Sequence, residues 1–171
     1  PALRVARDAS CSIRIARASK RNGDAPVQIV IGVDESDSTD LVVQAVAERF
    51  WPVGSKASLV AMRKSGPRDP GGQSETGLEL EAKADMLRAT GLEVSIGIKY
   101  GPPEDVLLQE ARDLSTDCIF VESHGLGDRQ SDGSDRRGLG KAVEAILLGA
   151  HCSVEIVRSK NLPEQYLKPA A

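Results

Sequence analysis

Two glycine-containing segments in the second half of the chain have the residue types of an anion site. The first is residues 123–127, Ser-His-Gly-Leu-Gly, and the second is residues 138–141, Gly-Leu-Gly-Lys. Glycine lets backbone N–H groups approach an anion closely, and a helix N-terminus adds a dipole that favours phosphate. Arg136, Arg137 and Lys141 add positive charge. The pattern is consistent with a phosphate site, and also with a glycine-rich surface loop that has a basic rim.

Two common nucleotide motifs are missing where they would be expected. A predicted strand at residues 27–33 is followed by Asp34, Glu35 and Ser36. The glycine-rich turn of a dinucleotide-binding fold is therefore missing, and NAD chemistry is disfavoured. Residues 135–142 resemble a P-loop but lack its first glycine and the hydroxyl residue after the lysine.

The sequence predicts neither a metal site nor a catalytic residue. Asp34, Glu35 and Asp37 are carboxylates of the kind that bind Mg²⁺, but helix capping is the simpler interpretation. His124 would need a nucleophile and an orienting acid to act in catalysis. Its neighbour Ser123 cannot easily face it on a strand end, so a loop histidine without catalytic duty is expected. The cysteines show no CxxC spacing, so zinc is not expected.

The composition limits the class of protein. Aromatic residues make up only 3% of the chain, so a core must be built from Val, Ile, Leu and Ala, as is usual in buried parallel sheets. A net charge of −3 argues against nucleic-acid binding, which normally needs a basic face. No apolar run approaches the roughly 20 residues of a membrane span, and arginines interrupt the N-terminal region. We therefore expect a cytoplasmic protein with no membrane partner.

Hydrophobic patterning predicts five strands that alternate with four helices. The strands are expected at residues 27–33, 57–62, 92–98, 118–121 and 152–158. This order predicts an α/β fold with a doubly wound, mainly parallel, five-stranded sheet. Ligands of such sheets bind beyond the carboxyl ends of the strands. The candidate places are therefore residues 33–37, the loop after Met62, and residues 122–141.

The helices are predicted from apolar residues at helical spacing. Their buried faces are expected to hold Leu41, Val42, Ala45, Val46 and Phe50 in the first, Leu80, Ala84 and Leu87 in the second, Leu107, Ala111 and Leu114 in the third, and Leu139, Val143, Ile146 and Leu147 in the fourth. A capping box at residues 76–79 predicts the start of the second helix, and Gly91 its end. Trp51 is expected to fill a gap in the core, and Cys118 to behave as a small buried hydrophobe.

A short passage occurs twice in the chain, 141 positions apart. Residues 9–17 and 150–158 share an alanine, a Cys-Ser pair, an isoleucine and a final arginine. We expect residues 1–20 to be the last helix and strand of a preceding sister domain, residues 26–160 to be one complete domain, and residues 161–171 to be a tail. Because an unpaired sheet edge needs covering, residues 11–17 are expected to pair antiparallel with residues 152–158 across a pseudo-two-fold axis.

Over residues 26–158 the chain resembles the universal stress protein family. The resemblance rests on residues 29–36, residues 123–127, residues 136–140 and the terminal Cys-Ser-Val-Glu-Ile-Val-Arg strand. It implies a flavodoxin-like sheet of the adenine-nucleotide alpha-hydrolase type and last strands that form dimers. In one branch of the family it also implies ATP that is bound without much turnover.

The motif of the ATP-binding branch is altered in this chain. That motif has a glycine, two residues, a second glycine, nine residues, and a third glycine followed by Ser or Thr. Glu122 stands at the first glycine, Gly125 and Gly140 match the second and third, and Lys141 replaces the hydroxyl residue. The second spacer, residues 126–139, has fourteen residues instead of nine.

The resemblance also implies which side chains would contact the base. Asp34 matches the acid that contacts adenine, and Val60 falls near the apolar residue that contacts the base. The candidate nucleotide-binding residues are Asp34, Val60, Gly125, Gly127, Gly140 and Lys141. Glu122 would add repulsion and bulk, which Lys141 offsets in part as a phosphate contact.

These observations predict a regulatory, dimerising domain with a degenerate ATP-type pocket. The alternative is an interaction or scaffold domain whose pocket is filled by side chains such as Glu122. An ATP-hydrolysing enzyme ranks last, because the phosphate-facing loop offers no general base other than Glu122 or His124.

Overall fold

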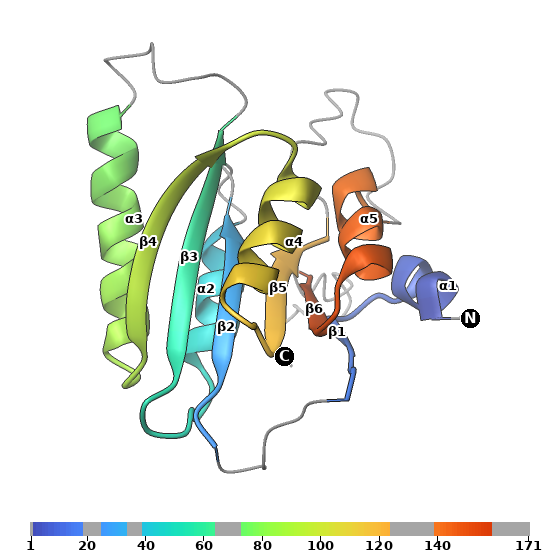
Figure 1. The fold of residues 1–171 in the computed structure, drawn as a ribbon, viewed down its shortest axis with the longest axis horizontal. Coiled ribbons are helices and arrows are strands. Elements are labelled where there is room, and N and C mark those ends of the chain that lie inside the picture. Colours follow the sequence, from blue (N-terminus) through green and yellow to red (C-terminus); the bar gives the residue numbers. More distant parts are fainter. Residues whose placement is uncertain (1, 19–24, 34–38, 64–72, 124–138, 159–171) are drawn as a thin grey trace, which may run out of the picture.

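The computed structural model describes residues 2–18, 25–33, 39–63, 73–123 and 139–158, which form one six-stranded sheet with helices on both faces (Figure 1). The strand order is β1-β6-β5-β2-β3-β4. The strands are β1 (Ile13–Ile15), β2 (Gln28–Val33), β3 (Lys56–Arg63), β4 (Glu93–Tyr100), β5 (Cys118–Glu122) and β6 (Ser153–Val157). Neighbours from β6 to β4 are parallel, and β1 runs antiparallel to β6. The predicted doubly wound, mainly parallel α/β sheet is confirmed.

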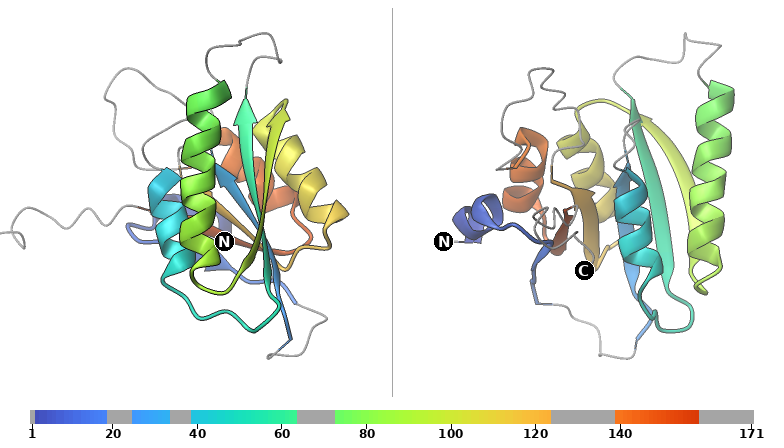
Figure 2. Two further views of the ribbon diagram at one scale, coloured as in Figure 1. Left: turned by 90° about the vertical axis from the view of Figure 1, so that its left-hand side faces the viewer. Right: turned by 180° about the vertical axis from the view of Figure 1, so that it is seen from behind.

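Two helices cover each face of this sheet, and a further helix lies beyond the β1 edge (Figures 1 and 2). The helices are α1 (Ala2–Asp8), α2 (Thr39–Ala47), α3 (Gln73–Arg88), α4 (Pro103–Asp113) and α5 (Lys141–Gly149). α2 and α3 pack on one face, and α4 and α5 pack on the other. α1 lies beside α5. No helix among these described segments is long and apolar enough to cross a membrane.

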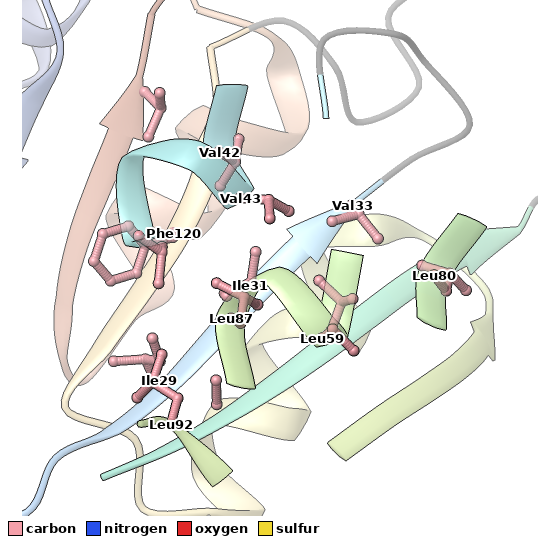
Figure 3. Close-up of a cluster of buried hydrophobic side chains, with 14 of the residues drawn as sticks. Ile29, Ile31, Val33, Val42, Val43, Leu59, Leu80, Leu87, Leu92 and Phe120 are labelled. Atoms are coloured by element: carbon pink, nitrogen blue, oxygen red, sulfur yellow. The ribbon is translucent and has the colours of Figure 1, made fainter. Parts of the chain in front are cut away.

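Alternate residues of the strands form the core beneath α2 and α3 (Figure 3). Ile29 and Ile31 of β2 and Phe120 of β5 are almost completely buried there. Trp51 closes this core from the side, with its ring centroid 6.1 Å from that of Phe120 and the planes 77° apart. Its Nε1–H donates to the carbonyl oxygen of Val46 at 2.9 Å. The predicted core position of Trp51 is confirmed.

A glycine in β2 allows α4 to pack close to the opposite face. A Cβ atom at Gly32 would lie 2.6 Å from Cδ1 of Leu107, which is inside van der Waals contact. Leu107 is fully buried in this second core, together with Val60 and Val121. The close approach of α4 brings its apolar stripe onto the centre of the sheet.

Two predicted core residues, both at helix ends, lie on the surface instead. α2 ends at Ala47, and the chain then turns so that Phe50 is fully exposed while Trp51 takes the inward place. Leu114 is the C-cap of α4 and is 37% exposed, because the chain leaves the helix there and Ser115 has a positive φ of 50°. Helical spacing holds only inside a helix, so it misplaced both residues.

The predicted start of α3 is also wrong. The helix begins at Gln73, so the presumed capping box at residues 76–79 lies inside it. Extending an existing helix costs far less than nucleating one, and the helix continues through the box sequence. The predicted inward residues Leu80, Ala84 and Leu87 are buried. Gly91 has the positive φ of 90° expected of the glycine that follows a helix.

Leu107 and Leu114 allow a matched test of this core. We expect Leu107→Ala to lower the free energy of unfolding by about 2–5 kcal/mol, because it leaves a cavity under α4. Leu114→Ala removes the same atoms from an exposed site and should cost less than about 1 kcal/mol. Urea denaturation followed by Trp51 fluorescence gives both values. Equal losses would contradict the assignment of Leu107 to the core.

Candidate functional site

The carboxyl ends of β2, β3 and β5 meet at one edge of the sheet, where ligands of doubly wound folds bind. The strands are in parallel register there, with Gly32 opposite Val60 and Ile31 opposite Phe120. Of the predicted site residues, Val60, Gly140 and Lys141 belong to the described part of the chain. Asp34, Gly125 and Gly127 lie outside the described residues, so their place in the site stays a prediction.

A backbone hydrogen bond joins the two halves of the glycine motif. The N–H of Gly140 donates to the carbonyl oxygen of Ser123 at 2.9 Å, and both residues are buried. Ser123 directly follows β5, and Gly140 is the N-cap of α5. The N-terminus of this nine-residue helix is therefore fixed at the carboxyl end of β5. Its dipole and its first-turn N–H groups make that place favourable for an anion.

Lys141 is the first residue of α5, and its side chain is exposed. The position after the third glycine of the motif thus lies at the helix start, as the sequence predicted. An ammonium group there adds positive charge to the helix dipole. It can hold a phosphate as a point charge, but it cannot accept a hydrogen bond as a hydroxyl can.

Glu122 brings negative charge to the carboxyl end of β5. It is the last residue of β5, directly before Ser123, and is half-buried with its Oε2 atom shielded from solvent. Strand alternation places Glu122 on the same face of the sheet as Phe120, under α2 and α3, whereas α5 packs on the other face. The carboxylate at the end of β5 opposes a phosphate bound nearby, while the α5 dipole favours that phosphate.

Val60 is buried too deeply to form an open surface for a nucleotide base. Its side chain is fully buried in the core under α4 and α5. Met62 lies two residues further along β3, on the same face and nearer the carboxyl end, and is 7% exposed. Met62 was not singled out from the sequence, although the alternation of a strand places it on the Val60 face.

A second candidate site lies beside β5, at the edge of the sheet where β1 pairs with β6. Ile13 lies opposite Ile156, Arg14 opposite Glu155, and Ile15 opposite Val154. This is the antiparallel arrangement that the repeated passage suggested for residues 11–17 and 152–158. The origin of residues 1–20 in a sister domain stays a prediction.

Hydrogen bonds extend the pairing beyond the strands, and they come in reciprocal sets. The N–H of Arg17 donates to Oγ of Ser153 at 3.0 Å, and the N–H of Arg158 donates to Oγ of Ser12 at 2.9 Å. Each arginine side chain also bonds a backbone carbonyl oxygen of the helix that precedes the other strand. Nη2 of Arg17 donates to the carbonyl oxygen of Leu147 at 2.5 Å, and Nη2 of Arg158 donates to that of Ala6 at 2.8 Å.

Two ion pairs border this edge. Arg7 of α1 binds Glu144 of α5 through two hydrogen bonds of 2.7 and 2.9 Å, which lower the pKa of the Glu144 carboxyl and raise that of Arg7. On the other face, Arg49 binds both carboxylate oxygens of the buried Glu155, one of them at 2.8 Å. The guanidinium of Arg49 also lies 5.2 Å from the centroid of Phe120.

The described thiols are not arranged for nucleophilic chemistry. Burial raises the pKa of Cys118 to about 12, and burial also raises that of Cys152. Cys11 is exposed. Within the described segments, no three His, Cys, Asp or Glu residues gather as a metal site would require.

The thiols differ enough in exposure to be told apart by alkylation. The thiolate is the reactive form, so at about pH 8.5 a thiol with a pKa near 12 stays protonated and unreactive. We expect iodoacetamide to modify Cys11 in the folded protein and to leave Cys118 unmodified, as read by peptide mass spectrometry. In urea all three cysteines should react. Rapid modification of Cys118 in the folded protein would contradict its burial.

Comparison with known proteins identifies the family. The family model described as the universal stress protein family matches residues 28–158. No curated protein matches the chain significantly.

Several solved structures share the fold. A universal stress protein from Archaeoglobus fulgidus DSM 4304 is 17% identical, with a TM-score of 0.62. The match covers 92% of this chain and 53% of that protein's chain. A universal stress protein in complex with cAMP is 22% identical, with a TM-score of 0.56, and covers 78% of this chain and 98% of its own. An Arabidopsis thaliana universal stress protein family protein with AMP bound is 19% identical, with a TM-score of 0.54, and covers 84% of this chain and 100% of its own. The family match spans most of the chain and coincides with the sheet and its helices, so this chain belongs to the universal stress protein family.

Proposed function

We propose that this chain is a regulatory, non-catalytic domain with an adenine-nucleotide site of reduced affinity. The observation that carries the proposal is the hydrogen bond between Gly140 and Ser123, which holds the α5 N-terminus at the carboxyl end of β5. That arrangement offers a phosphate the helix dipole and the charge of Lys141. Fold relatives solved with cAMP and AMP support an adenine nucleotide as the ligand class.

The charges at the site determine whether nucleotides bind more weakly or more tightly than they would with the unaltered motif. Glu122 lies next to Ser123 at the first glycine position of the motif, where it repels phosphate and takes up room. Lys141 offsets part of this repulsion. ATP, the ligand that the family resemblance implies, carries more negative charge than AMP, so Glu122 penalises ATP more strongly.

The second candidate function is a scaffold domain that binds no nucleotide. The half-buried position of Glu122 favours this alternative, because its side chain takes up room at the first glycine position of the motif and has one oxygen shielded from solvent. The two candidates differ in what removal of this side chain does.

We also propose that the domain works as one half of a tandem pair, with β6 as the shared edge. Reciprocal hydrogen bonds of Arg17 and Arg158 support an interface between two equivalent units. The A. fulgidus DSM 4304 protein supports it too, because the match covers 92% of this chain but only 53% of that one. That protein is long enough to hold a second domain of this size.

Replacing Glu122 by glycine separates the two candidate functions. We expect Glu122→Gly to tighten binding of AMP and ATP by about tenfold, which corresponds to about 1.4 kcal/mol, with the larger gain for ATP. Isothermal titration calorimetry measures both ligands. Glu93→Gly is the matched control, because Glu93 is an exposed residue at the start of β4, at the opposite end of the sheet. No binding by the wild type and by Glu122→Gly would support the scaffold alternative.

Lys141 should act in the opposite direction. Lys141→Ala removes the positive charge at the α5 start, and we expect AMP and ATP to bind about three- to tenfold more weakly. Lys99→Ala serves as the control, because Lys99 lies on the far edge strand β4 with its ammonium 3.4 Å from Glu110. Unchanged affinity in Lys141→Ala would remove this residue from the site.

A further inference from the structure

The β1–β6 register has an internal symmetry that follows from the repeat. The passage recurs after 141 residues, so Ile13 is equivalent to Val154 and Ile15 is equivalent to Ile156. In the structure Ile13 pairs with Ile156, and Ile15 pairs with Val154. Each pair is therefore the counterpart of the other, and a pseudo-two-fold axis passes between Arg14 and its own equivalent, Glu155.

Two pairs of residues break this symmetry, one by its register position and one by an ion pair, and in both an arginine is matched with a glutamate. On the axis, Arg14 lies opposite Glu155. Away from the axis, the Arg7 guanidinium donates two hydrogen bonds to the Glu144 carboxylate. The position equivalent to Arg7 in the second copy of the repeat is Leu148, which is not charged. The asymmetry therefore lies in the charges and not in the backbone pairing.

A partner with the same edge would lose the Arg7–Glu144 ion pair and the arginine opposite Glu155. Two α5–β6 edges in the same register would place Glu155 opposite Glu155, with Cα atoms about 4.5–5.5 Å apart, and Glu144 would face Leu148. Like charges directly opposite on paired strands are destabilising. Arg49 binds Glu155 from its own domain and offsets part of that repulsion. It does not supply the missing partner of Glu144.

We propose that these charges make the β6 edge selective for an unlike partner, an α1–β1-type edge with arginines at positions 7 and 14, and make it reject a second copy of itself. This inference rests on the proposed pairing with a sister domain, and it names what that sister must present. The backbone pairing and the serine–arginine hydrogen bonds would form with either kind of edge. Arg7 and Arg14 make the α1–β1 edge the preferred partner.

The full-length chain allows a direct test, because residues 2–17 can be made to resemble the rejected edge. Arg7→Leu with Arg14→Glu introduces the residues of the α5–β6 copy at the two asymmetric positions. Ile13→Val with Ala16→Val introduces residues of the same copy without changing charge, and is the matched control. The readout is hydrogen exchange of the β1 amides, measured by mass spectrometry on peptides that cover residues 11–17.

We expect the charge-changing variant to exchange about tenfold faster than the wild type, and the control to stay within about threefold. Arg14→Glu should also exchange faster than Arg14→Gln, with a difference that shrinks in high salt. This comparison separates charge from loss of the arginine stem.

The outcomes separate the two proposals. Unprotected β1 amides in the wild type would overturn the pairing itself and this inference with it. Protected amides in the wild type, together with equal exchange in the charge-changing variant and the control, would overturn the charge selection alone.

Discussion

The architecture depends on the fact that β6 cannot be left as an open edge. All five of its residues are buried, so both faces of the strand are covered by protein. A strand in that position has one row of N–H and C=O groups bonded to β5, and the other row needs partners as well. β1 provides them from a segment more than 130 residues away in the chain. The short β1 strand therefore completes the sheet, although it contributes little to the core itself.

This requirement explains why polar residues gather at the edge of an otherwise apolar sheet. Arg17 and Arg158 bond the carbonyl oxygens of Leu147 and Ala6, which lie near the ends of α5 and α1. Helix ends leave carbonyl groups without intrahelical partners. Here the arginine after β1 bonds such a carbonyl of α5, and the arginine after β6 bonds one of α1. The buried carboxylate of Glu155 is likewise held by Arg49. Buried charge is tolerated in this region because it is paired.

The sequence predicted the order of elements well because the signals were long and apolar. Short apolar runs such as residues 118–121, bounded by polar residues, favour buried strands, and the alternation of such strands with helices predicts a parallel sheet. The predictions that were wrong concern positions where elements end. Phe50 continued the helical spacing of α2, but the helix ends at Ala47, and Trp51 packs against Phe120 while Phe50 is exposed. That competition is a tertiary effect, and no local pattern records it.

The candidate site was predictable to a similar extent. The closeness of Ser123 and Gly140 follows from the rule that a helix after a parallel strand begins near that strand's carboxyl end. The burial of Val60 and Met62 depends on how far α4 approaches the sheet, and Gly32 allows that close approach. The bond between Arg49 and Glu155 joins residues 106 positions apart, so no spacing could predict it.

The candidate nucleotide site at Ser123 and Gly140 is connected to the β1–β6 pair through the end of β6. The N–H of Ser123 donates to the carbonyl oxygen of Val157 at 3.2 Å, and Glu122 lies opposite Val157 in the β5–β6 register. The next residue, Arg158, makes the reciprocal bonds to Ser12 and Ala6. A ligand that displaces Ser123 therefore acts on a residue adjacent to the interface. Such a ligand changes pairing only to the extent that it binds the paired and unpaired states differently. Val157 is therefore the residue through which the candidate site and the β1–β6 pair are in direct contact.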